Sequence, residues 1–74
     1  MTARLFTPPV LGAIKWYQFN VEAFPESPMA HARLGDAYAE MGDVAAAILH
    51  LERSLELAPS NGDLRERLEE LRHR

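Results

Sequence analysis

The chain has 74 residues, eleven acidic and eight basic, which gives a formal net charge of −3, and it contains no cysteine. This length allows one small domain of modest stability, since such a chain buries only about 60% of the surface that its unfolded form exposes. The lack of cysteine excludes disulfides and thiolate metal sites, and the acidic balance argues against nucleic acid, which is bound through clustered Lys and Arg.

Residues 1–7 show no regular pattern and are expected to form an N-terminal arm. Thr7, followed by Pro8 and Pro9, predicts the start of a first helix, because threonine is a good N-cap and proline is tolerated in a first helical turn. Pro25 disfavours helix at the residue before it, so this helix is expected over about 8–24.

Ser27 and Pro28 repeat the same start signal and predict a second helix over about 28–41. Gly42 is expected to end it, because glycine accepts the left-handed conformation found at helix C-termini. Asp43 can then cap a third helix over about 44–57, in which the alanines at 45–47 favour helix strongly.

The last predicted helix covers about 61–72. Pro59 closes the third helix, and the turn after it carries a Ser-x-x-Asp cap signal that begins at Ser60. No segment alternates between apolar and polar residues as a strand would. We therefore expect an all-α fold in which residues 8–74 form a single domain of about four helices, and short connections favour antiparallel hairpins.

The chain repeats itself with a period of 34 residues. Shifting the sequence by 34 places pairs identical residues: Val10 with Val44, Ala13 with Ala47, Ile14 with Ile48, Glu22 with Glu56, Pro25 with Pro59, Arg33 with Arg67 and Leu34 with Leu68. A fixed period of this length is typical of stacked helical units, which hide their apolar faces only against a neighbour or a partner.

Residues 28–61 resemble a tetratricopeptide repeat. The resemblance rests on the pattern His31-x-x-Leu34-Gly35-x-x-Tyr38, then Gly42-Asp43, then Ala47-x-x-x-Leu51, Ser54 and Pro59. His31 stands where the family usually has an aromatic residue, and Ser54 where a small apolar residue is common. The resemblance implies a right-handed stack of helix pairs and a non-catalytic protein-interaction module.

The flanking segments resemble half-repeats: residues 10–25 a preceding second helix, and residues 62–72 a following first helix. The run from Asn20 to Ser27, with Leu34-Gly35-Asp36-Ala37-Tyr38 after it, is also similar to helical tails of some bacterial serine hydrolases. An alternative function is therefore an accessory C-terminal tail that dimerises or positions such an enzyme. A purely structural repeat fragment without a ligand is a third interpretation.

The first helix is apolar almost all round, although a one-sided surface helix needs about half as many apolar residues. The resemblance implies that one face of this helix packs on the first helix of the same repeat. Residues 1–7 are too few to form that first helix. We predict that two copies bury this face on each other and form a homo-oligomer, with a dimer favoured; the alternative is that the arm folds back over it. The candidate residues are Leu5, Phe6, Val10, Ala13, Trp16, Tyr17 and Phe19.

The resemblance also implies a concave groove, lined by the first helix of each repeat, for an extended protein or peptide segment. The candidates are Met29, Ala32, Asp36, Glu40, Asp63, Glu66 and Glu70. Small and acidic side chains dominate this set, so a basic or apolar segment is the expected ligand. The competing interpretation is that these acids are ordinary solvated residues.

The sequence carries no catalytic or metal-binding motif. The three histidines lack the spacing of a ligand set, and no serine lies in a nucleophile motif. We therefore expect a non-enzyme without cofactor or metal. No apolar run approaches the ~20 residues that span a membrane, so neither a membrane nor nucleic acid is an expected partner. A soluble, cytoplasmic protein is expected, or a periplasmic or secreted one if the chain belongs to a larger precursor.

Overall fold

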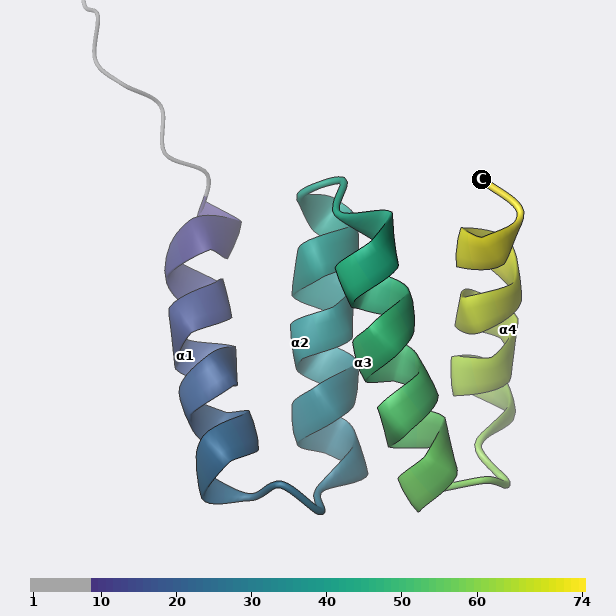
Figure 1. Cartoon of the computed structure of the whole chain (residues 1–74), viewed down its shortest axis with the longest axis horizontal. Helices are drawn as coiled ribbons and strands as arrows, with labels where there is room; N and C mark the ends of the chain where they lie inside the picture. The colour runs from purple at the N-terminus through teal and green to yellow at the C-terminus, as the bar shows by residue number, and fades with distance from the viewer. Residues whose placement is uncertain (1–8) are drawn as a thin grey trace, which may run out of the picture.

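Four helices make up the part of the chain that the structure describes, residues 9–74. Figure 1 shows the computed structural model, in which α1 spans Pro9–Ala23, α2 Pro28–Glu40, α3 Val44–Leu57 and α4 Gly62–Arg72. Side chains are described from residue 12 onward. Residues 9–74 contain no strand, so the predicted all-α class is confirmed. The predicted arm and the predicted cap at Thr7 lie outside the described residues.

The signals that begin and end α2 act as the sequence indicates. The Ser27 hydroxyl accepts a hydrogen bond from the Ala30 N–H at 3.2 Å, which satisfies one of the free donors of the first turn. At the other end Gly42 has a φ of +86°, the left-handed conformation that a residue with a side chain rarely adopts.

The next two helices also begin at side-chain caps. An Asp43 carboxylate oxygen accepts from the Ala46 N–H at 3.2 Å, as expected for the start of α3. At α4 the cap is Asn61, whose side-chain oxygen accepts from the Leu64 N–H at 3.3 Å. The cap signal that begins at Ser60 therefore points one residue too early, because Asn61 already has the extended backbone of an N-cap.

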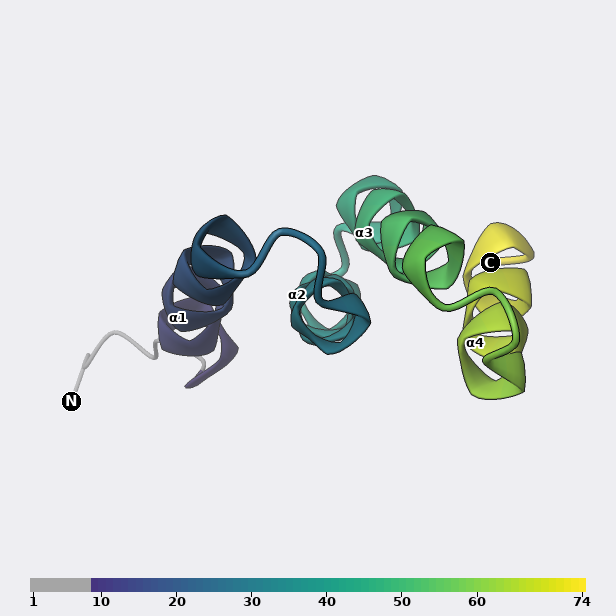
Figure 2. The same cartoon turned by 90° about the horizontal axis from the view of Figure 1, so that it is seen from below.

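The helices stand side by side in chain order, each antiparallel to the next (Figure 1). The α2–α3 pair shares the largest interface, followed by α1–α2 and α3–α4. Seen from below, α3 is displaced to one side of the line between α2 and α4, and α1 ends the row with nothing described on its far side (Figure 2). This is the stack of helical hairpins that the 34-residue period predicts.

Two apolar clusters hold the stack together. The larger joins α3 to α4 through Ala47, Leu51, Leu64, Leu68 and Leu71, with residues of α2 packed against it. The smaller joins α1 to α2 through Ile14, Leu34 and Ala37. The narrow leucine stripe of α4 therefore covers one end of the stack, while its charged faces remain exposed.

Gly35 lets α2 and α3 approach closely. A Cβ atom at this position would lie 2.9 Å from Leu51 Cγ and 3.1 Å from the Ala47 carbonyl oxygen. Both distances are shorter than ordinary van der Waals contacts, so only glycine fits without a shift of α3. The small residue in the repeat pattern thus has a direct steric reason.

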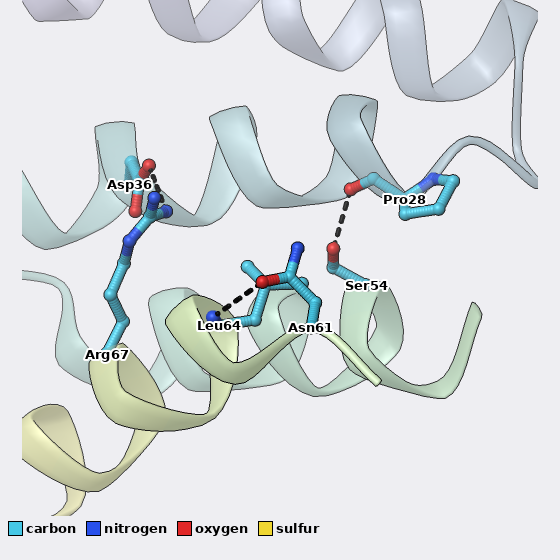
Figure 3. Close-up of polar contacts among 6 residues, drawn as sticks. All are labelled: Pro28, Asp36, Ser54, Asn61, Leu64 and Arg67. Atoms are coloured by element: carbon cyan, nitrogen blue, oxygen red, sulfur yellow. Dashed lines mark hydrogen bonds and ion pairs between the residues drawn. The ribbon is translucent and has the colours of Figure 1, made fainter. Parts of the chain in front are cut away.

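The two departures from the repeat pattern are accommodated by hydrogen bonds. The buried Ser54 hydroxyl on α3 donates to the Pro28 carbonyl oxygen at 2.6 Å and ties α3 to the first turn of α2 (Figure 3). His31 is 7% exposed, and its Nε2 donates to the Pro25 carbonyl oxygen at 2.8 Å. The imidazole of His31 therefore fills the aromatic position of the pattern, as predicted.

Lowering the pH through the histidine range should destabilise the fold. The rings of His31 and Tyr38 both stack on His50, with centroids 6.0 and 5.6 Å away. Burial, and secondarily the charge of His31, lowers the pKa of His50 from 6.5. The unfolded chain therefore takes up a proton first as the pH falls, so stability present above pH 6.5 is lost below it.

Urea unfolding at about pH 7.5 and about pH 5.5 measures this loss across the ordinary range of histidine titration. We expect His50→Gln to narrow the difference in unfolding free energy between the two conditions. An equal difference in the variant and the parent chain would mean that His50 is not responsible.

Candidate functional site

One face of α1, which borders the contact with α2, is less covered than the matching face of α3. One period apart, Ala13, Tyr17 and Asn20 correspond to residues that are fully buried on α3, namely Ala47, Leu51 and Ser54. The three α1 side chains are only half-buried. The difference arises because α3 is packed between α2 and α4, whereas α2 is the one helix among residues 9–74 that packs on α1.

Aromatic side chains dominate this part of the surface. Trp16 is 62% exposed, Phe24 is 64% exposed, and Phe19 stacks on Trp16 with a centroid separation of 5.9 Å. Trp16 lies one period before His50, whose ring packs against His31 and Tyr38. Exposed aromatic groups of this size are typical of protein interfaces.

The predicted self-association residues fall into three groups: exposed, half-buried and outside the described part of the chain. Trp16 and Phe19 lie on the open surface, whereas Ala13 is half-buried and Tyr17 packs partly against the small apolar cluster between α1 and α2. Leu5 and Phe6 lie outside the described residues, as does the side chain of Val10 in α1. The prediction did not include Phe24, which follows the last residue of α1; its counterpart one period later is the small Ala58.

A hollow of about 560 Å³ lies between α2 and α4, on the side where the groove was predicted. Of the groove candidates, Met29, Ala32 and Asp36 line it, and Glu70 lines a smaller hollow of about 160 Å³ nearby. The other candidates, Glu40, Asp63 and Glu66, line neither of these hollows. The remaining wall residues are Ser27, Pro28, Arg33, Ser54, Ala58, Asn61, Leu64 and Arg67.

The hollow is less acidic than its sequence-based description. An Arg67 guanidinium nitrogen on α4 lies 2.7 Å from a carboxylate oxygen of Asp36 on α2, so a base neutralises the acid across the opening (Figure 3). Arg33 also lines the wall. Sequence reasoning missed both arginines, although the 34-residue period pairs them and so places them at equivalent points on α2 and α4.

A second hollow, of about 200 Å³, lies between α1 and α2. Its walls include Tyr17, Asn20 and Phe24 from the α1 side and Met29 and Arg33 from α2. It adjoins the larger hollow, with which it shares Met29 and Arg33. The open face of α1 and the inner wall of α2 therefore form one continuous surface.

Other kinds of site find no support within residues 9–74. This part of the chain contains no group of three or more His, Asp or Glu side chains placed to hold a metal ion. None of its helices combines the length and apolar character needed to cross a bilayer.

A comparison with protein-family models matches the middle of the chain. Residues 28–61 match the family model of the tetratricopeptide repeat. The matched segment is the α2–α3 pair with the turn that follows it, and the four-helix stack agrees with this repeat. A search of curated proteins returned no match. Tetratricopeptide repeats are generally non-catalytic and bind proteins, so the repeat indicates a protein–protein interaction module.

Proposed function

We propose that this chain is a protein-interaction module that self-associates through the exposed surface of α1. The observation that carries the proposal is the exposure of Trp16 and its stacked neighbour Phe19, on a helix whose counterpart α3 is covered. Burial of a large apolar side chain contributes about 1.5–3 kcal/mol. A domain of this length has only about 4–11 kcal/mol of total stability, so covering these rings matters greatly.

The spacing along α1 suits an antiparallel pair of identical helices. Gly12, Trp16, Phe19 and Ala23 are separated by four, three and four residues, all are exposed, and they therefore form one stripe. About a two-fold axis at the middle of this stripe, Trp16 of one copy faces Phe19 of the other, and Gly12 faces Ala23. An isologous dimer needs this self-complementary arrangement. The exposed Lys15 and Glu22 flank the stripe and can pair between copies.

Replacing Trp16 with alanine should abolish dimer formation at micromolar concentration. Each copy loses the burial of one indole, so we expect the dissociation constant to rise at least about tenfold. Sedimentation velocity over a concentration series measures the change. Leu49→Ala is the matched control, because Leu49 is a large apolar residue that is 63% exposed on α3 and does not belong to α1. A parent chain that remains monomeric at every concentration would contradict the proposal.

The larger hollow is a second candidate surface for a protein partner. The apolar wall of the larger hollow, with Met29, Ala32 and Leu64, suits an apolar peptide segment, while its two arginines disfavour a basic one.

The alternative function, an accessory tail for a bacterial hydrolase, would use the exposed surface of α1 for dimerisation. An upstream hydrolase domain in the genomic reading frame would favour that alternative.

A further inference from the structure

We infer that the open face of α1 is a docking site for a partner helix that has the residue pattern of α2. The face consists of Ala13, Trp16, Tyr17 and Asn20 of α1, together with Phe24 directly after the helix. The inference rests on the proposed function as an interaction module and adds the chemistry of a second partner. Because the chain repeats itself, the contacts of α2 with α3 and α4 show what such a helix must provide.

The closest contact on α3 specifies a small residue in the partner helix. Gly35 of α2 lies against Leu51 and Ala47, where even a Cβ atom would come within 2.9 Å of Leu51 Cγ. One period earlier the corresponding α1 residues are Tyr17 and Ala13. Tyrosine is larger than leucine, so glycine is required opposite it.

Hydrogen bonding on α3 specifies how the partner helix begins. The Ser54 hydroxyl donates to the carbonyl oxygen of Pro28 in the first turn of α2. Asn20 takes the equivalent place on α1 and offers an amide N–H₂ donor. A helix that lies antiparallel to α1, with its first turn near Asn20, can accept this bond.

Charge specifies an acidic residue directly after the small one. Arg67 of α4 pairs with Asp36, which follows Gly35 on the neighbouring α2. Arg33 is the equivalent of Arg67 and lines the hollow between α1 and α2. A partner helix over this hollow would therefore place its acid beside Arg33, and a basic residue at the same position would be repelled by Arg33.

The stacking of His50 specifies two rings in the partner helix. His50 lies against His31 and Tyr38, which are seven residues apart on α2. Trp16 is the equivalent of His50 and is mostly exposed. The complete pattern is a ring, a small residue four positions later, an acid next to it, and a second ring two positions after the acid, on one amphipathic helix.

A synthetic peptide of residues 27–41 carries this pattern and is the probe. Trp16 is the only tryptophan of the chain and the peptide has none, so tryptophan fluorescence reports on the docking face directly. We expect a saturable blue shift when the peptide is added to the full chain. A peptide with Glu40→Ala, which changes a residue that is exposed on α2, should bind equally well.

Two altered peptides test the specified contacts. We expect Gly35→Leu in the peptide to abolish binding by steric overlap, and Asp36→Arg to weaken it at least about tenfold by repulsion from Arg33. The full chain with Arg33→Asp should then prefer the Asp36→Arg peptide to the parent peptide. Arg33 is exposed, so this exchange of preference does not depend on a change in folding.

The dimer stripe and the docking face share Trp16, so the titration is also run on the Phe19→Ala chain. Phe19 belongs to the stripe, but its counterpart Arg53 is exposed on α3, so this variant weakens the dimer and spares the docking face. Failure of the peptide to bind either chain, or binding that is insensitive to Gly35 and Asp36, overturns the inference. Sedimentation of the chain without peptide tests self-association separately, so the two proposals can fail independently.

Discussion

Replacing Leu51 with alanine should remove a large part of the free energy of unfolding of this chain. Leu51 has no exposed surface and lies in the cluster that joins α3 to α4, with α2 packed against it. Truncation of a buried leucine costs about 2–5 kcal/mol, because the lost burial is added to the cavity left behind. That is a large part of the about 4–11 kcal/mol expected for a domain of this length.

Urea unfolding followed by far-ultraviolet circular dichroism measures this loss. Leu49→Ala is the control, since it makes the same substitution two residues away on the same helix at a site that is 63% exposed. We expect its effect to stay within about 0.5 kcal/mol. Similar losses for the two variants would show that the interior of the helix stack does not carry the stability.

Replacing Gly35 with alanine should also destabilise the fold, although the same change inside a helix ordinarily stabilises it. Alanine has a helix propensity about 1 kcal/mol better than glycine. At this position, however, the added methyl group meets Leu51 Cγ and a backbone oxygen of α3, and the oxygen can give way only if the helix moves. Overpacking costs about 1–3 kcal/mol, so we expect a net loss.

Gly12→Ala is the comparison variant, because we expect it to raise the free energy of unfolding where Gly35→Ala lowers it. Gly12 lies in α1, and a Cβ atom built on it has no neighbour within 4 Å. We expect a gain of about 0.5–1 kcal/mol for the single chain, because helix propensity is all that changes within it. Thermal unfolding of both variants at one low concentration measures the contrast. A stabilised Gly35→Ala chain would contradict the close approach of α2 and α3.

The ends of α2 and α3 were predictable because their signals are local. Ser27, Gly42 and Asp43 act through bonds or backbone angles within a few residues of themselves, so neighbours in the sequence suffice to recognise them. The start of α4 was misjudged by one residue, since Ser60 and Asn61 are both good caps. The backbone selects Asn61.

The surface on α1 was predictable only in part. The excess of apolar residues on the first helix indicated an uncovered face, and Trp16 and Phe19 are indeed exposed. Whether Tyr17 packs against α2 or faces solvent depends on the rotation of α1 about its axis relative to α2, and the sequence does not show that rotation. The same limit applies to Arg67, whose pairing with Asp36 spans 31 residues and requires the packing of α4 against α3.

The period and most of the helix limits follow from the amino-acid sequence alone, because they depend on residue spacing or on a local backbone preference. Only the tertiary structure decides which surfaces remain open and which charges meet. Those properties depend on the rotation and separation of whole helices, which are set by the summed packing of side chains distant in the sequence. For this reason the hollow is less acidic than the sequence predicts: the packing of the helices places Arg67 across its opening, beside Asp36.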